Sequence, residues 1–155
     1  TYDDAMTMHW NEYTLKLNYA EPAHTDGDTV VYLYRNEALA AVHMGDLFFN
    51  GFYPFIDASS GGSAFGVVAG VEAVLEKIGD DTVVIPGHGP LATKADLQNY
   101  RDFLKSAVSR IAALKASGQS VEQIVAAEPL KDFEAEWGDG FLNTEVWISI
   151  VFAAI

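Results

Sequence analysis

The chain has 155 residues, half of them hydrophobic, and its 9 Lys and Arg residues stand against 22 Asp and Glu residues, which gives a formal net charge of −13. This composition is that of a globular protein long enough to bury one sizeable core. The negative charge excludes sequence-independent binding to nucleic acid and to anionic membranes, because both attract cationic surfaces. The absence of cysteine excludes disulfides, thiolate zinc sites, iron–sulfur clusters and cysteine nucleophiles.

The first third of the chain has the alternating polar and apolar pattern of β-strands. The polar pair at residues 11–12 separates two such runs and predicts a hairpin, and residues 35–37 predict a second turn. The runs on either side of that second turn are apolar enough to be buried on both faces. The segments that we expect to be strands are residues 5–10, 13–19, 29–34, 38–44 and 82–85.

The rest of the chain is predominantly helical in its pattern. One helix is predicted where apolar residues recur at helical spacing and stop at Gly79. A longer helix is predicted between a capping box formed by Thr93 and Asp96 and a terminating Gly118. The segments that we expect to be helices are residues 63–78, 94–117, 120–127 and a last helix that begins at Asn143 or Thr144. No apolar run reaches the roughly 18 residues that a membrane-spanning helix needs. We therefore expect one α/β (α+β) unit, a mixed β-sheet covered by helices.

Two histidines and one aspartate lie in glycine-containing loops at the ends of expected strands. His24 lies just before a strand, and Asp46 and His88 each lie just after one. Ligand sites collect in such loops, and two imidazoles with a carboxylate suit Zn, Fe or Mn. Each residue also has a structural interpretation: a histidine in a glycine-rich turn is commonly solvated, and Asp46 can close an Asx turn.

The other two histidines have simpler explanations. His43 lies inside an apolar run, which predicts a core residue or a support for a neighbouring ligand. His9 alternates on the first hairpin, which predicts an exposed side chain.

Three segments, in this order, resemble the later motifs of the metallo-β-lactamase fold hydrolases. They are His24-Thr25-Asp26-Gly27-Asp28, Gly45-Asp46-Leu47-Phe48-Phe49 and Pro86-Gly87-His88-Gly89-Pro90. The resemblance covers essentially the whole chain, and residues 55–57 with 59–63 are similar to a subgroup of bacterial hydrolases. It implies that His24 is the third histidine of a first metal site, that Asp46 bridges two metals, and that His88 is the last ligand of the second site.

The hallmark His-x-His-x-Asp-His motif of that family does not occur in the sequence. In the family this motif lies N-terminal to the region seen here and supplies most of the metal ligands. The resemblance therefore implies that residues 1–155 are one partial domain, the C-terminal half of an αββα sandwich, and the start at Thr1 fits a fragment. We expect one weak zinc site per chain from His24, Asp46 and His88, two zinc ions only if the missing segment is present, and no certain catalytic residue.

Two functions are compatible with this resemblance. The first is the C-terminal part of a zinc-dependent metallo-hydrolase, in which water or hydroxide attacks an ester, amide or lactam-type bond of a small molecule, and which is inactive as an isolated chain. The second is a truncated, non-catalytic, self-associating domain with a vestigial metal site. In both cases the apolar face of a half sandwich needs a cover. The expected partner is a second copy, in a homodimer or swapped oligomer, or the missing N-terminal half.

The loop over residues 45–63 is rich in aromatic side chains, which must pack on a core or line a pocket. Beside the expected metal site they would favour a partly apolar substrate, although the fold alone does not define it. The candidate pocket residues are Phe48, Phe49, Tyr53, Ser59 and Ser60. A periplasmic or secreted location in a bacterium is implied only by the family resemblance.

Overall fold

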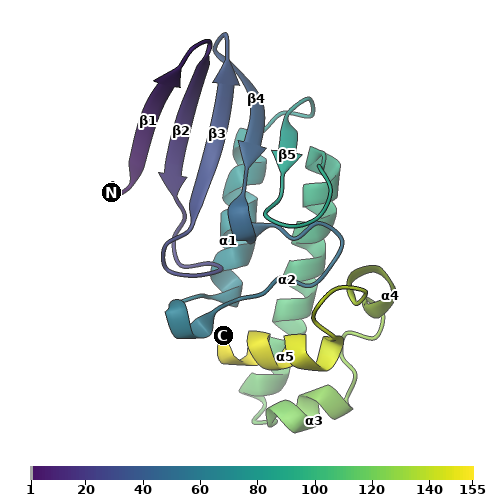
Figure 1. Ribbon diagram of the computed structural model, residues 1–155. Coiled ribbons are helices and arrows are strands. Elements are labelled where there is room, and N and C mark those ends of the chain that lie inside the picture. The colour runs from purple at the N-terminus through teal and green to yellow at the C-terminus, as the bar shows by residue number, and fades with distance from the viewer. Residues whose placement is uncertain (1) are drawn as a thin grey trace.

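The computed structural model describes residues 2–155, and its centre is one mixed five-stranded sheet. The strands lie side by side in chain order, and all neighbours are antiparallel except β4 and β5, which are parallel (Figure 1). The strands are β1 (Ala5–Trp10), β2 (Tyr13–Tyr19), β3 (Thr29–Arg35), β4 (Ala38–His43) and β5 (Val83–Ile85). All five predicted strands are therefore present, with ends shifted by at most one residue.

Both hairpin turns place residues in the left-handed region. Asn11 has a φ of 54°, which asparagine tolerates because its short side chain bonds locally. Asn36 and Glu37 have φ values of 50° and 66°, so the second turn needs two successive left-handed residues, as in the type I′ hairpin turn. Arg35 lies in β3 and not in the turn, where it was expected.

Helices α1 and α2 pack against each other and cover one face of the sheet on the side of β3, β4 and β5 (Figure 1). Helix α2 begins at the predicted capping box of Thr93 and Asp96. The last three helices lie beyond the ends of the strands, and of these the four-residue α4 was not predicted. The helices are α1 (Ala64–Lys77), α2 (Lys94–Ala116), α3 (Val121–Ala126), α4 (Glu134–Trp137) and α5 (Thr144–Ala153), with 3₁₀ turns η1 (Gly45–Leu47) and η2 (Ala58–Ser60).

The aromatic loop after η1 is anchored in the helical layer. Tyr53 stacks on Trp147 of α5, with ring centroids 4.7 Å apart, and Trp147 Nε1 donates a hydrogen bond of 2.8 Å to the carbonyl of Pro54. Phe103 of α2 stacks on Trp137 of α4 at 4.5 Å. These aromatic side chains belong to the core, so the loop that leads to the candidate site is held by packing.

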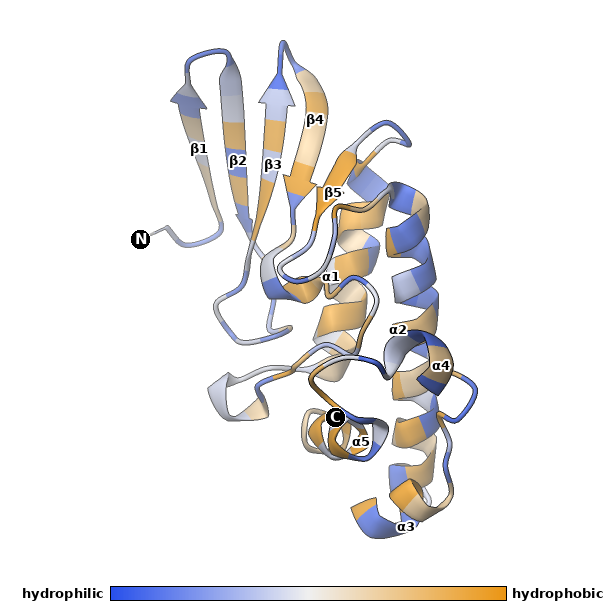
Figure 2. Ribbon diagram, turned by 45° about the vertical axis from the view of Figure 1, so that its right-hand side comes forward, coloured by the Kyte–Doolittle hydropathy of each residue, from blue (hydrophilic) through white to orange (hydrophobic). Residues whose placement is uncertain are grey.

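The face of the sheet opposite α1 and α2 has no covering layer among the described residues. One row of paired residues across this face is formed by Met8, Leu15, Leu33, Ala41 and Val83. Along β3 the buried residues Val30 and Tyr32 point to the helices, whereas Val31 and Leu33 on the open face are only partly buried. The expectation that β3 and β4 are buried on both faces is therefore wrong. Figure 2 shows hydrophobic residues in β4 and β5 as well as in the helices behind them.

His43 is exposed on this open face, so the prediction of a core histidine is wrong. Its Nδ1 accepts a hydrogen bond of 3.1 Å from the backbone N–H of Gly45 and so supports the turn that carries Asp46. His9 is exposed, as predicted. Across residues 2–155 we find no helix whose length and hydropathy would let it span a membrane.

Candidate metal centre

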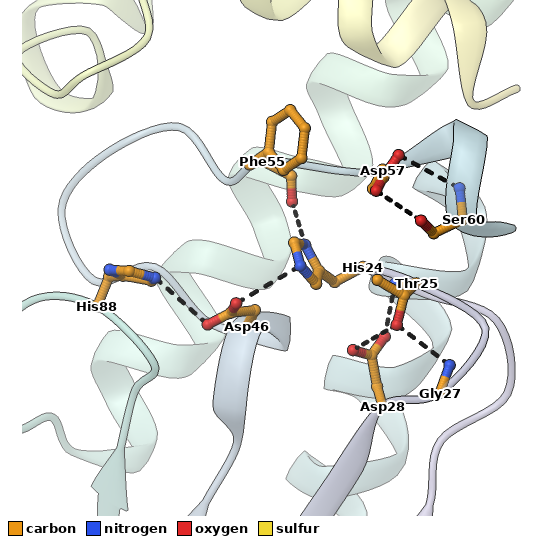
Figure 3. Close-up of polar contacts among 9 residues, drawn as sticks. All are labelled: His24, Thr25, Gly27, Asp28, Asp46, Phe55, Asp57, Ser60 and His88. Carbon is orange, nitrogen blue, oxygen red and sulfur yellow. Dashed lines mark hydrogen bonds and ion pairs between the residues drawn. The ribbon is translucent and has the colours of Figure 1, made fainter.

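The side chains of His24, Asp46 and His88 meet at one end of the sheet, although they come from three separate loops (Figure 3). His24 Nε2 lies 3.5 Å from Asp46 Oδ2, and His88 Nε2 lies 3.4 Å from Asp46 Oδ1. The loops converge because β3, β4 and β5 are neighbours, with the loop before β3 and the loops after β4 and β5 at the same end. Asp46 is thus placed between the two imidazoles, with one oxygen for each.

The orientation of His24 is fixed from its far side. Its Nδ1 lies 2.7 Å from the carbonyl oxygen of Phe55, which only accepts hydrogen bonds, so Nδ1 carries the proton. In the neutral ring Nε2 then has a free lone pair, and this lone pair faces Asp46. The side chain of His24 is only 16% exposed. A backbone carbonyl behind one ring nitrogen is one of the usual supports of a metal-binding histidine.

Asp46 lies in the η1 turn directly after β4. Gly45 begins this turn with a φ of +54°, which glycine adopts without a steric penalty. Gly87 packs directly against the same turn, because its N–H donates to the carbonyls of Gly45 (2.8 Å) and Phe48 (3.1 Å). A Cβ atom at Gly87 would collide with Oδ1 of Asp46 and with the backbone of Gly45. Glycine is therefore required for the Asp46 and His88 loops to approach each other.

His88 is the most exposed of the three side chains, at 50%. Its ring stacks on Phe49 with centroids 4.5 Å apart and an interplanar angle of 22°. The main chain is held by Asn50, whose N–H donates to the His88 carbonyl (2.9 Å) and whose side-chain amide donates to the Pro90 carbonyl (3.0 Å). Nothing in the sequence pattern singled out Asn50, since a polar residue in a loop is ordinary.

The arrangement places acceptor atoms opposite one another. An ionised carboxylate accepts only, and the unprotonated Nε2 of His24 also accepts, so the pair repels unless a proton or a cation lies between them. Each imidazole faces a different oxygen of Asp46, so two nitrogen–oxygen pairs share one carboxylate. Over residues 2–155, no group of three or more His, Cys, Asp or Glu side chains is arranged so that it could hold a metal ion by itself. A metal ion at Asp46 would therefore need further ligands besides these three residues.

The predicted pocket residues have three different environments. Phe48 and Tyr53 are fully buried in the core, so a role in lining an open pocket is wrong for both: the helices α2 and α5 cover them. Phe49 is buried but touches the site through its stack on His88. Ser59 and Ser60 are exposed and donate hydrogen bonds to the carboxylate of Asp57, which lowers the pKa of that carboxyl group.

Aromatic side chains also extend outwards from the two histidines. Phe55, 38% exposed, has its ring edge-on to His24 at 5.9 Å. Beyond Phe49 lies Phe141, which is 63% exposed and 6.1 Å from it. The sequence did not indicate Phe141, because the contact joins segments 92 positions apart along the chain (141 − 49).

The comparisons with known proteins identify the fold. No protein-family model and no curated protein matches the sequence. Among solved structures, the chain is similar to the inverting sec-alkylsulfatase Pisa1 from Pseudomonas sp., with 17% identity and a TM-score of 0.65 over 98% of this chain. It is also similar to metallo-β-lactamases from Staphylococcus aureus (18% identity, TM-score 0.52, 63% of this chain) and Pontibacter korlensis (17%, 0.52, 68%). At these identities the likeness defines the fold, which is the metallo-β-lactamase fold.

The chain spans only part of each of these structures: 25% of Pisa1, 33% of the S. aureus protein and 47% of the P. korlensis protein. One mixed five-stranded sheet with helices on one face is half of a metallo-β-lactamase sandwich. The predicted fold class is thereby confirmed.

Proposed function

We propose that this chain is the C-terminal, metal-binding part of a zinc-dependent hydrolase that cleaves an ester, amide or lactam-type bond in a small molecule. His24 and Asp46 would hold one zinc ion, and His88 with the second oxygen of Asp46 would contribute to the binding of another. The isolated chain is inactive and binds zinc weakly, because each position has too few ligands.

The observation that carries this proposal is the spacing of the donor atoms. Two ligands that each lie 2.0–2.1 Å from a tetrahedral zinc ion are roughly 3.3–3.4 Å apart. The Nε2–Oδ distances at Asp46 are 3.5 Å for His24 and 3.4 Å for His88. These are too long for good hydrogen bonds, for which about 2.7–3.2 Å is usual. The donor spacing thus suits a cation between each pair better than a shared proton.

The chain's own residues hold and orient the donors. Phe55 fixes the tautomer of His24 through its carbonyl, and Gly87 allows Asp46 and the His88 loop to meet. When bound, zinc polarises a carbonyl oxygen and lowers the pKa of a coordinated water. Catalytic zinc sites have three protein ligands, and each pair here has two. The missing ligands must come from another polypeptide segment, which is why we expect the isolated chain to be inactive.

The open sheet face suggests where that segment lies. Trp10 is 68% exposed and Met8 46% exposed on this face, although soluble monomers rarely leave a large apolar patch uncovered. Pisa1 matches nearly all of this chain with only a quarter of its own length. We propose that the missing N-terminal half covers the open face and brings the remaining ligands to Asp46.

Zinc titration by calorimetry tests the proposal, with the His9→Gln variant as a control for an exposed histidine outside the site. We expect weak binding that Asp46→Asn reduces by at least about tenfold and that His9→Gln leaves unchanged. Equal binding by all three proteins would contradict the assignment. Hydrolysis of a chromogenic ester and of a chromogenic β-lactam by the zinc-loaded chain alone would contradict the proposed inactivity.

The second candidate, a non-catalytic self-associating domain, is favoured by the same apolar face. Two copies that pack open face to open face would each cover Leu15 and Leu33. The formal charge of −13 on each copy opposes this association at low salt. Light scattering at micromolar concentration distinguishes the candidates: a dimer that strengthens with salt supports self-association, and a monomer that binds the N-terminal half supports the first proposal.

A further inference from the structure

The carboxylate of Asp57 organises a short turn beside the candidate site. Its two oxygens accept four hydrogen bonds, from the N–H groups of Ser59 (3.0 Å) and Ser60 (3.3 Å) and from the hydroxyls of Ser59 (2.5 Å) and Ser60 (2.7 Å). These bonds close the η2 turn, which ends at Gly61 in the left-handed region. All the bonds of this carboxylate are local, and Figure 3 shows it directed at Ser60 and separate from Asp46.

The same turn is hydrogen-bonded to the loop of His24 through the main chain. The N–H of Asp57 donates to the carbonyl of His24 (2.8 Å), and the N–H of Asp26 donates to the carbonyl of Ser60 (2.9 Å). The carbonyl of Phe55, two residues before Asp57, accepts from Nδ1 of His24 (2.7 Å). His24 is therefore held at its ring and at its main chain by one segment, residues 55–60.

The turn and the His24 loop approach each other closely at Gly62. A Cβ atom at Gly62 would lie 2.8 Å from the Asp57 carbonyl oxygen and would overlap the His24 carbonyl oxygen. A shift of the turn would thus move the Phe55 carbonyl relative to the imidazole. Without this hydrogen-bond acceptor, the proton of the neutral His24 ring could lie on either ring nitrogen.

We infer that Asp57 is a positioning residue of the metal centre: its carboxylate fixes the turn that holds the Phe55 carbonyl, and this carbonyl keeps Nε2 of His24 free to bind a metal. The inference rests on the proposed metal-binding role of His24. The simpler explanation is that Asp57 only stabilises a surface turn. The two differ in what happens to the tautomer of His24.

The test compares Asp57→Ala and Asp57→Asn with Asp96→Ala. Asp96 is a matched control, because its carboxylate also accepts from a backbone N–H and a hydroxyl, both of Thr93 and both at 2.7 Å, but it caps α2 outside the site. The first measurement is the ¹⁵N chemical shifts of the His24 ring in metal-free protein. The second is the Zn²⁺ affinity by calorimetry.

We expect Asp57→Ala to mix the two His24 tautomers and to weaken Zn²⁺ binding by about tenfold, the lower end of the range for lost support of a metal ligand. Asp57→Asn keeps one acceptor oxygen, so it should reduce the Zn²⁺ affinity by a smaller factor. Asp96→Ala should leave both measurements unchanged, although it destabilises α2. The milder Ser60→Ala, which removes one donor, gives a smaller change in the same direction and serves if Asp57→Ala does not fold.

An Asp57→Ala protein that folds, keeps the Nδ1–H tautomer and binds Zn²⁺ as the unchanged chain does would overturn the inference. If the unchanged chain binds no Zn²⁺, the proposed function fails, but the tautomer measurement still decides whether Asp57 orients His24. The two failures are therefore distinguishable.

Discussion

His24 and Asp46 face each other with Nε2 and Oδ2 3.5 Å apart, and the proton of the imidazole is on the opposite nitrogen, against the Phe55 carbonyl. Two acceptor atoms held in this way repel each other unless a proton or a cation lies between them. The fold holds them so because each atom is fixed from behind, by the turn around Asp57 for His24 and by the Gly87 contact for Asp46. The fold itself, and not a short hydrogen bond between them, therefore holds these two atoms opposite each other.

The two histidines should contribute unequally to metal binding. His24 is 16% exposed and fixed by a hydrogen bond, whereas His88 is 50% exposed and supported by a stack on Phe49. A less mobile ligand loses less conformational entropy on binding. We expect His24→Ala to weaken Zn²⁺ affinity more than His88→Ala, as measured by calorimetry. The reverse order would place the stronger site at His88.

Gly87→Ala should damage the site without removing any ligand. The added methyl group would collide with Asp46 Oδ1 and with the Gly45 backbone, so the η1 turn must shift. We expect a loss of about 1–3 kcal/mol in the free energy of unfolding, measured with urea, together with weaker Zn²⁺ binding. Gly27→Ala is the control, because the nearest atom to its added methyl group is 4.0 Å away. If both variants behave alike, the close approach at Gly87 does not position Asp46.

Trp147→Phe tests the anchoring of the aromatic loop. The ring stack on Tyr53 is retained in part, but the hydrogen bond from Nε1 to the buried Pro54 carbonyl is lost. An unsatisfied buried carbonyl costs about 1–3 kcal/mol, which urea denaturation measures. The same substitution at the exposed Trp10 should change stability by less than about 0.5 kcal/mol. Equal effects at both positions would show that the loop is not anchored through Trp147.

Carboxylates that accept hydrogen bonds in the folded state should make the protein sensitive to acid. Hydrogen bonds lower the pKa of Asp57, Asp96 and Asp132 below their ordinary value of 3.8, through Ser59 and Ser60, Thr93 and Arg110 respectively. A group with a lowered pKa in the folded state stabilises the protein above its unfolded pKa, and this stabilisation is lost as the pH falls through the folded pKa. We expect the Tm to fall as the pH is lowered below about 4. If the Tm of Asp132→Asn falls less on acidification than that of the unchanged chain, protonation of Asp132 contributes to the acid sensitivity. Identical dependence of the Tm on pH in the two proteins would exclude this contribution.

Much of the fold could be predicted from the sequence, because the bounds of most strands and helices depend on local sequence patterns. The alternation in residues 5–19 and the capping box of Thr93 and Asp96 each depend on neighbours a few positions away. The burial of β3 and β4 could not be predicted, since the same apolar run suits a strand covered on one face or on two. For this reason His43 is not the core residue that was one of its two predicted roles, and it instead supports the turn that carries Asp46.

The three side chains that meet at the candidate site could be singled out from the sequence, whereas most of the residues that position them could not. His24, Asp46 and His88 stand out because glycines surround them in loops at strand ends. Asn50 acts through a long-range bond to Pro90, which no local pattern reveals. Tyr53 was expected at a pocket and is instead in the core, because its partner Trp147 is 94 positions further along the chain (147 − 53).

The most direct test of the metal centre follows the four histidines one by one during a Zn²⁺ titration. The ring-nitrogen resonances of ¹⁵N-labelled protein report which nitrogen of which histidine binds metal. We expect that Nε2 of His24 and Nε2 of His88 respond, and that the exposed His9 and His43 do not. A response at Nδ1 of His24, a response confined to His9 or His43, or no response at any histidine would contradict it.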